Sequence, residues 1–200
     1  MAMKFQYNKT FLQQLNKELK VRLNALPTLQ AKESALRVEV KKAKRIVADL
    51  EKQVKKLEED IAPTFRLWTE FPDNLVSISY IDVDFKKIAG VQTPIFRGVD
   101  IGVSPFSMFN APPWLPAGIH LLKQFVSLRI EKEIARENVA ILEYARKKTT
   151  QKVNLYEKVQ IPAYEEGIRK IKRFLEDEEN LAKSSQKILK TRLAQAEVAS

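Results

Sequence analysis

The chain contains no cysteine and a single histidine, His120. Disulfides and thiol chemistry are therefore excluded, and one imidazole cannot form the ligand set of a transition metal. Glycine is also scarce, and none of the five glycines begins a GxxxxGK[ST] or GxGxxG phosphate-binding motif. The sequence thus predicts no catalytic residue, no metal site and no cofactor.

Long apolar runs are absent as well. No stretch approaches the roughly 18 apolar residues of a membrane span, and the start, MAMKFQYNKTFLQQL, lacks the apolar core of a signal peptide. We therefore expect a cytoplasmic protein with no direct membrane insertion, which is either soluble or held at a membrane by partners.

The net charge of +10 lies on the two flanks, residues 1–61 and 119–200, while residues 62–118 are nearly neutral. A basic flank can bind nucleic acid, an anionic membrane or an acidic protein surface. Single-strand recognition requires aromatic residues interleaved with basic ones, and here acidic residues interrupt the basic stripe instead. We expect no nucleic-acid partner and assign most of these charges to solvated helix faces.

Both flanks carry apolar residues in the 3-4 alternation that is typical of a coiled-coil seam. In the first flank only Arg22 and Glu33 break it, and the positions are Leu12, Leu15, Leu19, Arg22, Leu26, Leu29, Glu33, Leu36, Val40, Ala43, Val47, Leu50, Val54, Leu57 and Ile61. The second flank has Leu121, Phe125, Leu128, Lys132, Ala135, Val139, Leu142, Arg146, Thr149, Val153 and Tyr156. Beyond Pro162 the stripe resumes one residue out of step, at Tyr164, Ile168, Ile171, Leu175, Glu178, Ala182, Ser185 and Leu189. Because such long helices need a partner in water, each flank is predicted to pair with the other.

Two prolines interrupt these helices in different ways. The 3-4 steps continue unbroken across Pro27, so we expect the helix to continue there with a local bend. The alternative is a new helix capped by Thr28. At Pro162 the phase slips, which predicts the sharper irregularity at that point.

The middle of the chain has the alternation of β-strands. LVSISYIDVDFKKI and PIFRGVDIGV predict two strands joined by a turn near Ala89-Gly90, with Pro94 on an exposed edge or at a bulge. SPFSMFNAPPWLPAG follows as an irregular connector. Trp68 and Trp114 are expected to pack under the hairpin, with the alternative that they anchor a partner at an exposed tip. His120 is expected to lie at a surface or interface.

Asp82 and Asp84 lie two residues apart on one strand. They could be imagined as paired catalytic acids, but no base or nucleophile stands near them in the sequence. We interpret them as edge-strand charges.

The expected fold is therefore mainly α. A helix from about Lys4 to Ile61 and a second from about Leu115 to the C-terminus form a long antiparallel two-helix coiled coil with a small β-hairpin knob. The corresponding divisions are 1–61, 62–118 and 119–200.

The two helices resemble those of the D subunits of V-type and A-type rotary ATPases, the family that forms the central rotor shaft. The first arm, NKTFLQQLNKELKVRLNALPTLQAKESAL, is similar to the first helix of that family through Leu29, Lys32 and Leu36. The more specific likeness is VNLYEKVQIPAYEEGIRKIKRFLEDEENLAKSSQKILK, with Val153, Asn154, Glu157, Ile161, Pro162, Ile168, Ile171, Leu175, Lys187 and Lys190. The family's usual glycine and basic pair are replaced around Ala25-Leu26-Pro27 and Glu33-Ser34, as in a divergent bacterial branch.

This resemblance implies a non-catalytic subunit that transmits torque between ATP chemistry and proton or sodium movement. Its implied partners are the catalytic ring of A and B subunits, the small F subunit, and a socket subunit on the membrane rotor ring.

Two sets of contacts are hypotheses within that resemblance. Those toward the catalytic ring are Lys17, Lys20, Arg22, Lys183, Lys187, Lys190 and Arg192. The F subunit is expected to contact Arg45, Asp49, Lys52, Lys56, Arg129, Arg136 and Tyr144.

Two other functions use similar architectures. A prefoldin-like chaperone also joins coiled-coil arms through β-hairpins, but it predicts arms of equal length, whereas the second arm here is longer. A membrane-remodelling or nucleic-acid-binding helical hairpin predicts a concentrated basic face, which the mixed charges do not supply.

Overall fold

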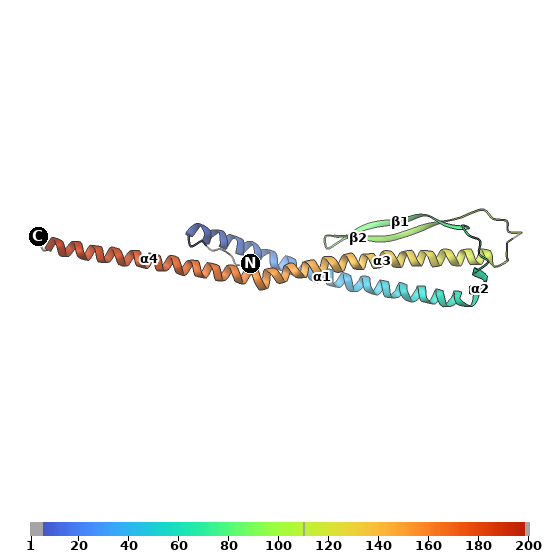
Figure 1. Ribbon diagram of the computed structural model, residues 1–200, viewed down its shortest axis with the longest axis horizontal. Helices are drawn as coiled ribbons and strands as arrows, with labels where there is room; N and C mark the ends of the chain where they lie inside the picture. The colour runs from blue at the N-terminus through green and yellow to red at the C-terminus, as the bar shows by residue number, and fades with distance from the viewer. Residues whose placement is uncertain (1–5, 110, 199–200) are drawn as a thin grey trace. The chain divides into compact units, whose positions relative to one another are not determined.

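The computed structural model describes residues 6–109 and 111–198 (Figure 1). The elements in chain order are α1 (Lys9–Ile61), the 3-10 turn η1 (Ala62–Thr64), the short helix α2 (Phe65–Trp68), β1 (Val76–Ile88), β2 (Val91–Val103), α3 (Leu115–Leu155), the π-helical turn η2 (Tyr156–Gln160) and α4 (Ile161–Val198). A β-hairpin thus lies in the chain between two long helical arms. This confirms the predicted mainly α fold with a small hairpin between the arms.

The chain divides into two compact units, each of which contains parts of both arms. The terminal unit combines α1 up to Ala31 with the chain from Thr150 onward, and the hairpin unit comprises residues 32–149. These units cut across both helical arms. The division into 1–61, 62–118 and 119–200 stays a prediction.

Within each unit the two arms run antiparallel. In the terminal unit Glu18 contacts Tyr164 while the later Arg22 contacts the earlier Gln160. In the hairpin unit three ion pairs join the arms in the same opposed order, namely Lys44 with Glu143, Glu51 with Arg136 and Glu58 with Arg129.

The predicted seam is buried along the whole of α1, since each of its positions from Leu12 to Ile61 is buried or half-buried. The second arm follows its predicted seam in the same way as far as Leu175. From Glu178 onward the prediction is wrong, because the seam positions there are exposed. The seam ends because α1 begins only at Lys9, so the described part of the terminal unit offers distal α4 no helix to pack against.

The first helix begins later than predicted. The expected start, Lys4, falls in residues 1–5, which lie outside the described residues, and the chain is not helical from Gln6 to Asn8. The Asn8 side chain accepts a hydrogen bond from the backbone N–H of Phe11 (2.7 Å), as an N-cap residue does. This side chain satisfies a donor that has no partner inside the helix, and therefore favours a start at Lys9.

Pro27 lies inside α1, so the helix continues there as the unbroken phase predicts. The alternative of a new helix capped by Thr28 is wrong, because the Thr28 hydroxyl donates backwards, to the carbonyl of Ala25. A bend of the helix axis at Pro27 stays a prediction.

The slip of phase in the second arm coincides with the π-turn η2. A π-turn closes its hydrogen bonds over five residues instead of four, and here the N–H of Ile161 donates to the carbonyl of Tyr156. Such a turn accommodates one extra residue. This equals the one-residue shift of the apolar stripe that the sequence shows beyond Pro162. Pro162 follows directly, at a point where the α-helical hydrogen bonds are already interrupted. A bend at Pro162 also stays a prediction.

The strands pair antiparallel in a two-stranded sheet, and Ala89 and Gly90 form the predicted turn. Both turn residues have positive φ, 49° and 78°, which is the pattern of a type I′ hairpin turn. The register shifts between Ile78 and Tyr80 and between Asp82 and Val83. Pro94 is at neither irregularity. It pairs with Phe85, so the expectation of a bulge at Pro94 is wrong. Pro94 does lie on an edge strand, as expected, because both strands of a two-stranded sheet are edges, but it is buried rather than exposed.

Both ends of the hairpin are anchored on the helices of the hairpin unit, where it lies alongside α3 (Figure 1). At the turn, Ala89 and Val91 pack on a buried cluster of Leu36, Val40, Ala43 and Leu142. At the base, Val76 and Val103 pack on Leu75, Leu115 and Ile119.

An aromatic cluster completes the base of the hairpin. The rings of Trp68 and Trp114 lie 5.9 Å apart, and Phe71 contacts both. This agrees with the packing role predicted for the tryptophans. Asn110, within the predicted connector, lies outside the described residues.

Candidate functional site

Within 6–109 and 111–198 no three or more His, Cys, Asp or Glu side chains come together as a potential metal site. In the same part of the chain, no helix combines the length and the apolar character needed to span a membrane. The features described next are surfaces that could bind other proteins.

Asp84 forms a cross-strand ion pair with Arg97, between Oδ2 and Nη2 at 2.5 Å. The hydrogen bond from Arg97, followed by that from the Phe85 backbone, holds the pKa of Asp84 below its usual range. Asp84 is thus a strand charge with a structural partner, as the sequence suggested. His120 is exposed on α3, with its Nε2 3.0 Å from Nε2 of Gln124.

Six of the seven basic residues predicted to contact a catalytic ring are exposed. Lys17 and Lys20 lie on α1, and the other four lie on distal α4, namely Lys183, Lys187, Lys190 and Arg192. Lys183 has an ion pair with Glu179, one turn earlier on the same helix, at 2.8 Å. The steps from 183 to 187 and 190 place these three lysines on one face of α4.

The seventh, Arg22, has partners within the terminal unit. Its Nε donates to Oε1 of Gln160 at 2.8 Å, and its guanidinium lies 4.4 Å from the centre of the Tyr164 ring. Its Nη1 lies 3.4 Å from a carboxylate oxygen of Glu18, and the hydroxyl of Tyr164 donates to the same oxygen at 2.7 Å. We name Arg22, Gln160, Tyr164 and Glu18 the Arg22 cluster. Sequence reasoning missed it, because nothing in the local pattern marks residues 138 positions apart as partners.

Acidification is expected to weaken the terminal unit through Glu18. The hydrogen bond from Tyr164, then that from Gln14, lowers the pKa of Glu18 from its ordinary value of 4.5. A lowered folded pKa stabilises the fold above pH 4.5, and that contribution is lost as the pH falls through the folded pKa. Thermal unfolding between pH 6 and 3 should therefore show a smaller acid-induced loss in Glu18→Gln than in the wild type. An identical loss in both proteins would contradict this role of Glu18.

The residues predicted to contact the F subunit lie in the hairpin unit and are exposed, but two of them have partners across the arms. Arg136 binds Glu51 at 2.7 Å and Arg129 binds Glu58 at 3.7 Å. Asp49 and Lys52 approach each other at 3.9 Å within α1. Tyr144 is 64% exposed, with Lys148 Nζ 5.5 Å from its ring centre. Arg45 and Lys56 are also exposed, and these contacts stay a prediction.

With Lys44 and Glu143, the pairs of Arg136 and Arg129 form a ladder in which successive pairs are seven residues apart on each arm. This is the spacing of charges that flank a coiled-coil seam. Each pair is about half exposed, so the ladder contributes more to the register of the arms than to their stability. The sequence carried a signal for it, since charges at 44, 51 and 58 are matched by opposite charges at 143, 136 and 129.

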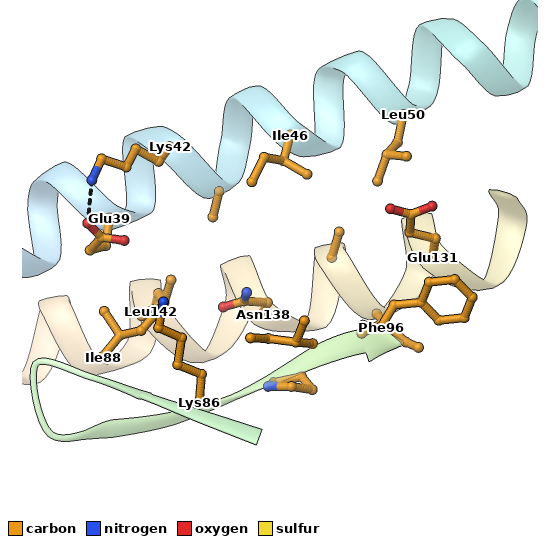
Figure 2. A pocket seen from close by; sticks show the side chains of 15 residues that line it. Glu39, Lys42, Ile46, Leu50, Lys86, Ile88, Phe96, Glu131, Asn138 and Leu142 are labelled. Atoms are coloured by element: carbon orange, nitrogen blue, oxygen red, sulfur yellow. Dashed lines mark hydrogen bonds and ion pairs between the residues drawn. The ribbon is translucent and has the colours of Figure 1, made fainter. Parts of the chain in front are cut away.

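The hairpin covers one flank of the helix pair and leaves a cleft of about 360 Å³ beneath it (Figure 2). Ile46 and Leu50 extend into it from α1, and Lys86 and Ile88 extend from the hairpin (Figure 2). Asn138 of α3 also lines the cleft, and its Oδ1 is buried without a hydrogen-bond partner.

A second cleft, of about 390 Å³, lies where α1 ends. Its lining is almost wholly apolar and comprises Ile61, Ala62, Phe65, Trp68, Leu122 and Phe125, with Glu58 beside them. Phe65 is 69% exposed, although an aromatic side chain is normally buried. We name this surface the apolar cup; such a surface is typical of a protein-binding site.

The chain is similar to known proteins over most of its length. Residues 11–191 match the family described as the ATP synthase D subunit. A V-type ATP synthase D subunit of Borreliella burgdorferi is 32% identical over 194 residues, which cover 95% of each chain. A V-type ATP synthase D subunit of Chlamydia pneumoniae is 32% identical over 169 residues, 82% of this chain and 81% of that protein. This chain belongs to the family of ATP synthase D subunits.

Proposed function

We propose that this chain is the central-stalk subunit of a V/A-type rotary ATPase, a rotor that performs no catalysis itself. In this role it transmits torque between ATP hydrolysis or synthesis in a ring of A and B subunits and proton or sodium translocation by the membrane rotor. The complex places it at the cytoplasmic side of the membrane, as a peripheral subunit.

The observation that carries this proposal is the distal part of α4. From Glu176 to Leu193 every residue is exposed, and large apolar side chains lie among the lysines, with Leu181 70% and Ile188 56% exposed. A helix that stayed in water would not keep such side chains on its surface. A helix enclosed by a ring of subunits would contact partners on several faces, which suits one face of lysines and another of apolar residues.

Two other surfaces support the remaining partners. The apolar cup has the character expected for docking into a socket subunit. The exposed charges beside the ladder, with Tyr144, form the proposed contact with the F subunit.

Charge reversal on distal α4 tests the catalytic-ring contact. We expect Lys183→Glu with Lys187→Glu and Lys190→Glu to lower affinity for the A and B ring roughly tenfold at low salt, and less at high salt because salt screens exposed charges. The measurements are copurification with A and B subunits and ATP-driven ion pumping.

The matched control reverses Lys41, Lys147 and Lys152, which are also exposed but lie outside the predicted contacts. Binding and pumping should stay at the wild-type level in this control. If the distal variant behaves like the control at both salt concentrations, the proposed contact is wrong.

A further inference from the structure

Two apolar stripes run along α4 on different faces. The first consists of Tyr164, Ile168 and Ile171, which are buried against Leu15 of α1. The second consists of Leu181 and Ile188, seven residues apart and exposed, and it begins at Phe174, seven residues earlier and 46% exposed. Phe174 contacts Tyr7, with ring centres 4.9 Å apart, whereas Leu181 is 70% and Ile188 56% exposed.

The π-turn determines which stripe faces α1. Counted backwards in alternating steps of three and four residues, the second stripe passes from Phe174 through Gly167 and Gln160 to Tyr156. Tyr156 is the last position of the seam that runs along α3, so the second stripe continues that seam. The first stripe is one residue out of step with that seam. Since one residue rotates a helix by about 100°, the extra residue of η2 turns the first stripe toward α1 and the second stripe away from it.

The Arg22 cluster holds the last residue of this turn. Gln160 ends η2, and its side chain accepts the hydrogen bond from Arg22. Arg22 also stacks on Tyr164, the first member of the buried stripe, and Glu18 binds both Arg22 and Tyr164. Arg22 occupies a half-buried seam position where the pattern calls for an apolar residue. Its polar contacts thus replace a packing contact at the level of the π-turn.

We propose that η2 and the Arg22 cluster form a register lock, which sets the angle at which the exposed stripe of Leu181 and Ile188 is presented to a partner. Arg22 is then a positioning residue for distal α4, rather than a contact with the ring itself. That the partner is the catalytic ring rests on the proposed function. The lock itself is a property of the terminal unit and is tested separately.

The first experiment tests the lock in the full chain. Arg22→Leu removes every contact of the cluster that Arg22 makes but supplies the apolar side chain that the seam expects. We expect the backbone amides of residues 156–163 to exchange hydrogen at least about tenfold faster, while the midpoint of thermal unfolding does not fall. A residue that only stabilises the fold would lower the midpoint as well.

Two variants control this measurement. Arg37→Leu removes an arginine whose ion pair, with Glu33, stays within α1, and it should leave residues 156–163 protected. Gln160→Glu keeps an acceptor for Arg22 and should also retain protection. If Arg22→Leu exchanges no faster in this segment than Arg37→Leu, there is no lock.

The second experiment tests the angle with two deletions of one residue. Deleting Val159 removes the extra residue of η2, so the second arm can continue as a regular α-helix. Both stripes then stay on the faces that they occupy in the wild type. Deleting Asp177 leaves η2 intact but rotates Leu181 and Ile188 by about 100° relative to the buried stripe. We expect binding to the A and B ring to be retained after the first deletion and to fall at least about tenfold after the second, with Asp177→Asn as the charge control.

These outcomes separate the two proposals. If the wild type binds the ring and the Asp177 deletion binds equally well, the angle is irrelevant and the inference fails, while the proposed function stands. If the wild type itself does not bind the ring, the proposed function fails, and hydrogen exchange still decides whether the lock exists.

Discussion

Leu36→Ala is expected to lower the free energy of unfolding by about 2–5 kcal/mol, the largest loss of stability that we predict. Leu36 is fully buried, in a cluster with Val40, Ala43 and Leu142 that also receives the hairpin through Ala89 and Val91. The substitution leaves a cavity where α1, α3 and the hairpin meet. These elements are held apart by their other contacts and cannot fully collapse into it. Urea unfolding followed by circular dichroism measures the loss.

Val38→Ala provides the control on the same helix. Val38 is two residues away and 52% exposed, so its removal should change the free energy of unfolding by no more than about 0.5 kcal/mol. Equal losses from Leu36→Ala and Val38→Ala would mean that the cluster around Leu36 is not a packed core.

Gly118→Ala is expected to destabilise the base of the hairpin, with a net loss of up to about 2 kcal/mol. A methyl group at this position of α3 would lie 2.7 and 2.9 Å from two ring carbons of Trp114. The Trp114 ring is held by Trp68 and Phe71, so it has little room to move. Overpacking of this kind costs about 1–3 kcal/mol, which outweighs up to about 1 kcal/mol gained by replacing glycine within a helix.

Tryptophan fluorescence reports this change directly, because the chain's two tryptophans are both in this cluster. The expected result is a shifted emission maximum together with a lower urea midpoint. Gly98→Ala is the matched control, since nothing lies within 4 Å of its added methyl group. If Gly118→Ala leaves both emission and midpoint as they are in Gly98→Ala, Trp114 is not packed as described.

The predictions that rested on periodicity held best. The seam along α1, the hairpin with its turn at Ala89-Gly90 and the continuation of the helix through Pro27 all follow from spacing along the chain. Spacing is informative because side chains three or four residues apart share a helix face, and alternate side chains share a strand face, whatever the rest of the chain does.

The predictions that failed depended on which other parts of the chain pack against a residue. The repeat on α4 continues past Leu175, yet distal α4 is exposed, since burial needs a partner and α1 begins only at Lys9. The burial of Pro94 likewise depends on the helices beneath the hairpin, with which it lines a cleft. Arg22 has internal partners that its charge alone does not reveal, and its predicted contact with the catalytic ring stays a prediction.

Periodicity along the chain was enough to predict the helical arms, the hairpin between them and the one-residue slip at Pro162, and the quoted motifs indicated the family. The packed structure was needed to show that a π-turn absorbs the slip, that Arg22 binds Gln160 at its end, and that Leu181 and Ile188 are exposed. The physical reason is that local periodicity dictates which residues share a face, whereas the rotation of that face and the contacts made across it are settled when two arms pack together.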